Sequence, residues 1–348
     1  MERGYIMLKN LRYFYSAFII TIIGITAAVI LEPEHKTYAL YLVTVLALLE
    51  ISLSFDNAVI NAKVLSKMPK KWQKIFIWVG LPIAVFGMRL VFPILLVNIT
   101  TNLSFTDVFH LATSDPKSYQ QALMAGFPTI FSFGGGFLIM VFLKFFIAEK
   151  HDTNWFKILE ENKIVTLLRS YPGGYIIIAL VIGYIVIDNY GTTGSDSLAL
   201  AFLMGLMVHE SLGLLNHIFS SNMSGKIAMN GLMGFLYLEV LDASFSFDGV
   251  IGAFAISTNI FIIMIGLGIG AMYVRSLTIF FVEHKTLSKF RYLEHGAHYA
   301  IGFLAVVMFL KIFIHVPEWL TGTIGIGLII LAYIHSINAN SKNQIAEQ

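Results

Sequence analysis

Long apolar runs constrain this chain more than any other feature. Stretches of 18 or more mostly apolar residues recur from one end of the 348-residue sequence to the other. A run of that length can cross a bilayer as a single helix. Charged residues make up only 13% of the chain, whereas soluble domains carry about 25%. The sequence therefore predicts an all-α polytopic membrane protein whose main partner is the lipid bilayer.

Apolar length divides the chain into about ten predicted spans. The first five are expected near Phe14–Leu31, Tyr38–Ala62, Ile75–Ile99, Pro128–Ala148 and Gly174–Asp188. The second five are expected near Leu198–Ser220, Gly231–Ile256, Asn259–Val282, Ala297–Ile314 and Trp319–Ile337. We predict a first repeat with the N-terminal helix at 1–148 and a cytoplasmic loop with connecting helices at 149–230. A second repeat with the C-terminal helices follows at 231–337, and a cytoplasmic tail at 338–348.

The distribution of basic residues fits ten spans, because lysine and arginine favour cytoplasmic loops. They gather before the first span, in the 63–74 loop, in the 150–169 loop and in the 285–291 loop. With ten spans, all four segments fall on the same side, so both termini are predicted to be cytoplasmic. The formal net charge of only +2 gives no reason to expect nucleic-acid binding.

A short acidic motif occurs twice, each time inside a predicted span. The first copy is Glu50–Asn57 (EISLSFDN) and the second is Asp242–Gly249 (DASFSFDG). A Gly-Leu-x-Ile segment follows each copy and leads, at the same spacing, to Arg89 and to Arg275. Because five span steps separate the copies, they are predicted to run in opposite directions, as in transporters built from inverted repeats.

Carboxyl groups inside the spans indicate a function, because a carboxylate at the bilayer centre costs about 2.5–3.5 kcal/mol on insertion scales. Arginine pairing could offset part of this penalty, and a bound cation the rest. Carboxylate, hydroxyl and amide oxygens are hard ligands that suit Mn²⁺, Ca²⁺ and Mg²⁺, and the absence of Cys excludes thiolate sites. The predicted metal ligands are Glu50, Ser54, Asp56, Asn57, Glu239, Asp242, Ser246 and Asp248, with Arg89 and Arg275 as charge partners or gating groups.

Helical geometry leaves two arrangements open. At about 100° per residue, Glu50, Ser54 and Asn57 share one stripe, whereas Asp56 faces nearly the opposite way. One straight helix cannot aim both faces at a single ion. Either there are two sites, or the helices unwind at 54–57 and at 246–249, where Gly249 favours unwinding.

Two further features lie outside the motifs. Glu283, His284, Glu294, His295 and His298 are expected in a solvated loop and helix start, with a metal-collecting vestibule as the alternative. The triple glycine at 134–136 is expected to permit close helix contact.

At the two acidic motifs the chain resembles the TerC family of membrane proteins, named for tellurium resistance and placed in the LysE-type transporter superfamily. The stretch Tyr292–His298 (YLEHGAH) and the long chain suggest a larger branch of that family. The resemblance implies manganese export and resistance to metal or tellurite stress. It also implies that Glu50, Asp56, Asn57, Asp242 and Asp248 form the metal site. Together with the simple loops, it favours the cytoplasmic membrane of a prokaryote.

The sequence thus predicts a transporter of a hard divalent cation, with manganese efflux first and Ca²⁺ or Mg²⁺ as alternative cargo. Protons are a candidate coupling ion, and neither a resident cofactor nor an enzyme activity is expected. One alternative is a non-transporting membrane component of a metal- or tellurite-stress complex. A remote one is an intramembrane aspartyl protease using Asp56 and Asp248, although the Gly-x-Gly-Asp context of that class is absent.

Overall fold

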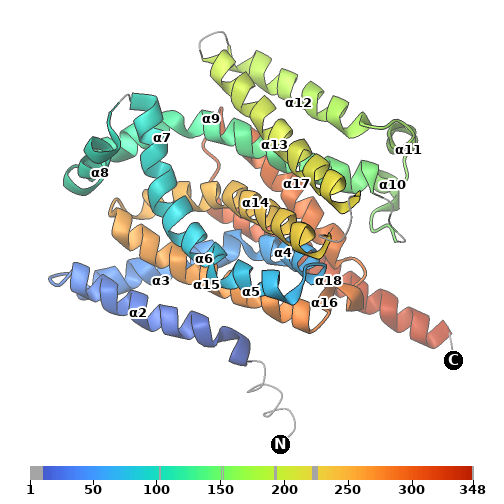
Figure 1. The fold of residues 1–348 in the computed structure, drawn as a ribbon, viewed down its shortest axis with the longest axis horizontal. Helices are drawn as coiled ribbons and strands as arrows, with labels where there is room; N and C mark the ends of the chain where they lie inside the picture. The colour runs from blue at the N-terminus through green and yellow to red at the C-terminus, as the bar shows by residue number, and fades with distance from the viewer. Residues whose placement is uncertain are drawn as a thin grey trace, which may run out of the picture. The chain divides into compact units, whose positions relative to one another are not determined.

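Helices make up all the regular structure of the described chain (Figure 1). The structure is a computed structural model, and it describes residues 11–346 except 102, 150, 152, 192–193 and 222–225. Within that part, seven helices are long and apolar enough to cross a membrane, or up to nine if each of two bent pairs counts as one span. The chain is therefore an all-α membrane protein, and the number of ten spans stays a prediction.

The chain forms two compact units. The first comprises 1–127 and 234–284. Its elements are η1 (Arg12–Phe14), α2 (Tyr15–Leu31), α3 (Lys36–Leu53), α4 (Phe55–Ser66), α5 (Lys70–Trp78), α6 (Gly80–Pro82), η2 (Ile83–Val91), α7 (Phe92–Thr101), α8 (Phe105–Ser114), the start of α9 (Pro116–Leu143), most of α14 (Lys226–Ile256) and α15 (Ile260–Glu283).

The second unit comprises 128–233 and 285–348. Besides the remainder of α9 and of α14, it contains η3 (Lys144–Ala148), α10 (Lys157–Glu160), α11 (Lys163–Arg169), α12 (Gly174–Tyr190), α13 (Ser195–Ser221), α16 (Thr286–Lys289), α17 (Leu293–Lys311) and α18 (Glu318–Ala346). These units differ from the segments predicted from the sequence, which stay a prediction.

Helices cover all ten predicted spans, but several spans are not single straight helices. The second is divided between α3 and α4, and the third is bent by 40° between Lys70–Trp78 and Ile83–Leu95. The fifth, α12, follows α11 after a bend of 118°. Helix α14 covers the seventh, but it carries three acidic residues, so apolar length alone does not identify it as a span.

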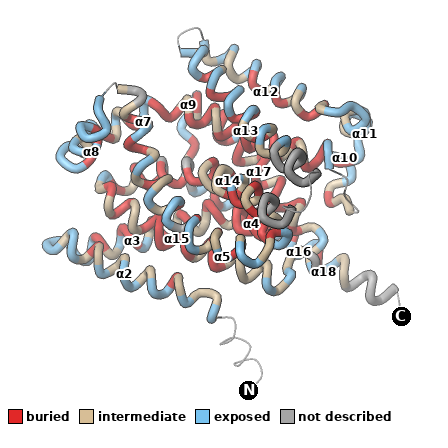
Figure 2. The backbone as a smooth tube through the Cα atoms, in the orientation of Figure 1, coloured by how far each residue is buried: buried red, intermediate tan, exposed pale blue. Residues whose placement is uncertain are grey.

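Burial separates central from peripheral helices in the first unit. Helix α15 packs against α2, α3, α4 and η2, and 72% of its most apolar window is buried. Only 11% of the corresponding window of α2 is buried, and Figure 2 shows this helix as mostly exposed or half-buried. Exposed residues of α2 are nevertheless apolar, as Ile22 and Ile30 are. Lipid is the solvent that suits such a face.

Small residues bring α9 and α13 together in the second unit. A Cβ atom at Gly136 would lie 2.9 Å from the carbonyl oxygen of Phe202, and one at Gly205 would collide with the carbonyl oxygen of Phe133. Each helix therefore approaches the backbone of the other at a glycine. The close contact expected at the triple glycine is confirmed.

Gly205→Ala should destabilise the protein by about 1–3 kcal/mol, because the added methyl group meets backbone that cannot easily move. Gly327→Ala is the control, since no atom lies within 4 Å of a Cβ there. Thermal unfolding in detergent, followed by circular dichroism, should give a lower midpoint for the first variant only. An unchanged midpoint for Gly205→Ala would contradict the close approach.

Candidate metal centre

The two acidic motifs lie against each other within the first unit. The Asn57 side-chain amide donates a 2.6 Å hydrogen bond to Oδ1 of Asp242. A Cβ atom at Gly249 would lie 3.0 Å from Oε2 of Glu50. The last residue of each motif copy therefore meets the first residue of the other copy.

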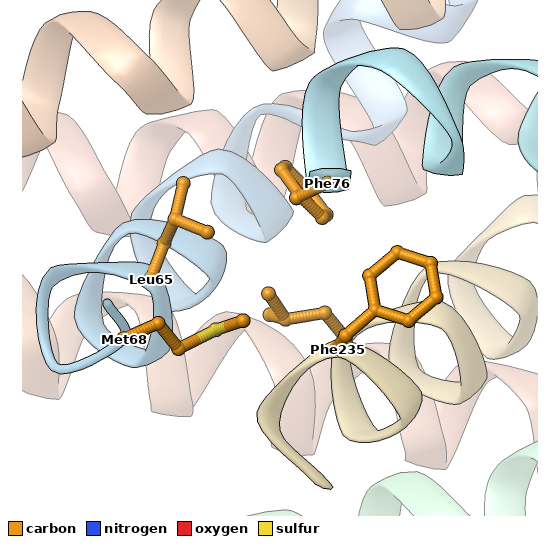
Figure 3. Close-up of a cluster of buried hydrophobic side chains, with 5 residues drawn as sticks. Leu65, Met68, Phe76 and Phe235 are labelled. Atoms are coloured by element: carbon orange, nitrogen blue, oxygen red, sulfur yellow. The ribbon is translucent and has the colours of Figure 1, made fainter. Parts of the chain in front are cut away.

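The contacts between α4 and α14 continue in opposite chain directions. Asn57 near the start of α4 is bonded to Asp242, and Met68, two residues after the end of α4, has its sulfur 2.9 Å from the position of a Cβ atom at Gly234. The stretch between these contacts is filled by an apolar cluster (Figure 3) made of Leu65, Met68, Phe76, Phe235 and Leu238. Contacts at higher residue numbers on the α4 side thus meet lower residue numbers on α14, as antiparallel helices require. The inverted repeat as a whole stays a prediction.

A buried ion pair fixes the first acid of the first motif. Oε1 of Glu50 accepts hydrogen bonds from Nη2 of Arg89, at 2.5 Å, and from the Ser54 hydroxyl, at 3.0 Å. Nη1 of Arg89 donates to the carbonyl oxygen of Ala84 within η2, a π-helical segment. The side chains of Glu50 and Arg89 are only 3% and 1% exposed, so Arg89 is a charge partner that water does not screen.

Arg275 plays the matching part in the second motif. Its Nη2 donates to Oδ2 of Asp242 at 3.2 Å and lies 3.7 Å from Oε1 of Glu239. The guanidinium also donates to the carbonyl oxygens of Phe76 and Gly80, at 2.7 and 2.9 Å, and lies over the Phe76 ring. A Cβ atom at Gly80 would collide with the ends of the Glu239 and Arg275 side chains, so glycine makes room for them where they lie.

Asp56 differs from these paired acids. It is buried in the first turn of α4, where one carboxylate oxygen accepts the backbone N–H of Asn57 at 3.0 Å. A helix N-terminus favours a carboxylate through its exposed N–H groups. Among the described residues, Asp56 takes part in no ion pair. Four described carboxyl groups thus face two guanidinium groups, which leaves two negative charges unmatched when all are ionised.

The two motif helices are not broken alike. Helix α3 ends at Leu53 and α4 begins at Phe55, and Ser54 lies between them outside helical geometry (φ −107°, ψ 13°). Helix α14 continues without interruption from residue 226 to 256. Of the two arrangements left open, the helix interruption is therefore found in the first copy at Ser54 but not at Gly249 in the second.

The remaining predicted ligands add little to a carboxylate site. Ser246 is buried in α14, and the side chain of Asp248 lies outside the described residues. No group of three or more His, Asp or Glu residues is placed to hold a metal ion within the part of the chain that the structure describes. A cation held here would need other oxygen ligands as well.

Sequence reasoning overlooked Asn61, one helical turn after Asn57. Its side chain is 1% exposed, and its Oδ1 has no hydrogen-bond partner among the described residues. An amide inside the apolar run Ala58–Ala62 was the available signal.

The histidine-rich segment at 283–298 is divided between the two units, with Glu283 and His284 in the first and Glu294, His295 and His298 in the second. His298 stacks on the Phe145 ring at 3.6 Å between ring centres, and Nε2 of His295 lies 3.6 Å from a carboxylate oxygen of Glu160. Both histidines are buried. The expectation of a solvated segment is therefore wrong for His295 and His298.

These features define a class: a helical membrane protein with two arginine-paired acidic motifs buried in one unit. The chain belongs to the family described as "Protein of unknown function (DUF475)", whose family model matches residues 55–343. The match begins inside the first motif, so Glu50 lies just before it. No curated protein and no solved structure matches the chain.

Arg89→Gln should destabilise the protein by about 3–5 kcal/mol, because it leaves the Glu50 carboxylate buried without its partner. Lys70→Gln is the matched control: the Lys70–Glu283 pair is exposed, and such pairs contribute about 1 kcal/mol or less. The double variant Glu50→Gln/Arg89→Gln should recover part of the loss. Chemical unfolding in detergent measures all three, and equal effects of the two single variants would contradict the assignment.

Proposed function

We propose that this protein is a membrane transporter of a hard divalent cation, with manganese as the favoured cargo and efflux as the favoured direction. One observation carries the proposal: the Asn57–Asp242 hydrogen bond joins two acidic motifs in a buried place where carboxyl groups outnumber guanidinium groups. Carboxyl groups inside spans are expensive, so a surplus of them favours a visiting cation.

The arrangement suits release as well as binding. Arg89 holds Glu50, and Arg275 holds Asp242, so these carboxylates remain compensated after an ion has left. Asp56 lacks such a partner among the described residues, so its negative charge favours a cation in this region. Rearrangement of the two motif-bearing halves would expose the ion to either side of the membrane in turn.

The choice of manganese rests on ligand type and on the TerC resemblance. The described site offers carboxylate, amide and hydroxyl oxygens and no thiol, which suits Mn²⁺, Ca²⁺ and Mg²⁺. The resemblance selects manganese among these and supplies the direction. Protons can titrate the same carboxyl groups, so they are the proposed coupling ion.

A second candidate function is a non-transporting membrane component of a stress-response complex. The observation in its favour is that arginine already pairs with Glu50, Glu239 and Asp242. Under that reading the charges only hold helices together. Peptide cleavage is not proposed, because neither motif has the Gly-x-Gly-Asp context of intramembrane aspartyl proteases. We place both termini in the cytoplasm of a prokaryote, as the basic loops suggest.

Purified protein in liposomes should carry Mn²⁺ across the bilayer faster than protein-free liposomes do. Asp56→Asn should lower the rate by about tenfold or more, since it removes an unpaired negative charge directly beside Asn57. Asp196→Asn alters an exposed acid at the start of α13 and should leave the rate unchanged. Quenching of an encapsulated dye by Mn²⁺ reports the rate.

Wild-type liposomes that admit no more Mn²⁺ than empty ones would favour the second candidate. In cells, efflux requires that loss of the protein raises manganese content and that Asp56→Ala reproduces this effect. Normal manganese tolerance in that variant would count against efflux.

A further inference from the structure

The two motif copies are unequal where they face each other. When the copies are aligned, Asn57 corresponds to Gly249, and Asn61, one turn later, corresponds to Ala253. Helix α4 therefore presents two side-chain amides, whereas the equivalent positions of α14 present none. A site that uses these amides can exist only once in the chain.

Three buried oxygen atoms beside these positions have no hydrogen-bond partner among the described residues. They are Oδ1 of Asn57, Oδ1 of Asn61 and Oε1 of Glu239. The last of these lies 3.7 Å from Nη2 of Arg275, so it is in an ion pair although it accepts no hydrogen bond. Leaving such a group unsatisfied costs about 1–3 kcal/mol, and native proteins contain few of them. Each has a free lone pair, which is what a cation requires of its ligands.

Helix contacts place these atoms at the same level of the α4–α14 interface. Asn57 is bonded to Asp242, and Leu65 shares the apolar cluster with Leu238. Asn61 lies midway between Asn57 and Leu65 on α4. It therefore lies beside the Leu238–Asp242 stretch of α14, which includes Glu239.

The opposite side of the motif pair offers much less. Glu50 already accepts hydrogen bonds from Arg89 and Ser54. The residue that approaches it from the second copy is Gly249, which has no side chain to offer. Both sides thus contain an arginine–carboxylate pair, but only the Asn57 side also offers amide oxygens that have no hydrogen-bond partner among the described residues.

We propose that the protein has one asymmetric cation site, formed by the side-chain oxygens of Asn57 and Asn61 with the carboxylates of Glu239 and Asp242. The proposed ligand is a hard divalent cation, and this assignment rests on the proposed function for its cargo. The apolar cluster beyond Asn61 separates the site from the exposed lysines of α5. Asn61 is then a specificity-determining ligand that the first motif has and the second lacks.

The test is Mn²⁺ binding to the purified full-length protein in detergent, measured by titration calorimetry and by electron paramagnetic resonance of free Mn²⁺. Wild type should bind one Mn²⁺ per chain. Asn61→Leu should weaken binding by about tenfold or more, whereas the metal-free unfolding midpoint should stay unchanged or rise, because an unsatisfied buried amide has been removed. Asn189→Leu, an exposed amide in α12, is the control.

Asn61→Asp keeps an oxygen at the same place and should bind Mn²⁺ at least as well as wild type. This variant tests the site even if Asn61→Leu folds poorly. Three results would overturn the site. They are no Mn²⁺ binding to the wild type, two equivalent Mn²⁺ ions per chain, and wild-type affinity in a folded Asn61→Leu variant. Binding that Asn61→Leu abolishes in a protein without Mn²⁺ flux would support the site and end the transport proposal. Flux that survives in Asn61→Leu with unchanged affinity would overturn the site alone.

Discussion

A carboxyl group in the interior of a membrane helix bundle needs a compensating positive charge, and this need organises the first unit. Each motif begins with an acid that pairs with the arginine following its own Gly-Leu-x-Ile segment: Glu50 with Arg89 and Asp242 with Arg275. The same pairing in both copies ties α3 to η2 and α14 to α15. It also orients the two acids toward the place where the copies meet.

Close approach between the copies depends on the residues that flank these pairs. Gly80 makes room for Glu239 and Arg275, and Gly249 makes room for Glu50. Asn57 uses the space on the other side to bond Asp242. The result is a polar layer with surplus carboxylate, bordered along α4 by the apolar cluster, and we interpret it as the resting arrangement of a cation pathway.

Local signals account for what the sequence predicted well. Apolar length predicted helices at all ten spans because a membrane helix must be apolar along its own length. The shared spacing to Arg89 and Arg275 predicted charge partners because the repeat preserves both members of each pair. The low helix propensity of glycine suggested unwinding at Gly249, but such propensities are weak where packing decides. This glycine stays helical and makes room for the Glu50 side chain.

The features that were missed depend on tertiary contacts. At the bend between α5 and η2, the carbonyl oxygens of Phe76 and Gly80 accept hydrogen bonds from Arg275, and His295 packs against the Phe145 ring. These partners are distant in the sequence. The position of Asn61 beside the second motif follows only from the antiparallel packing of α4 and α14. The role that we propose for it depends on a side-chain oxygen without a hydrogen-bond partner among the described residues, which no single-helix pattern reveals.

Anomalous X-ray scattering at the manganese absorption edge, from crystals of the wild-type protein grown with Mn²⁺, tests the central claim most directly. Our account predicts one strong peak per chain between α4 and α14, within coordination distance of Asn57 and Asn61. A peak elsewhere, such as beside His295, or no peak at saturating Mn²⁺, would contradict it.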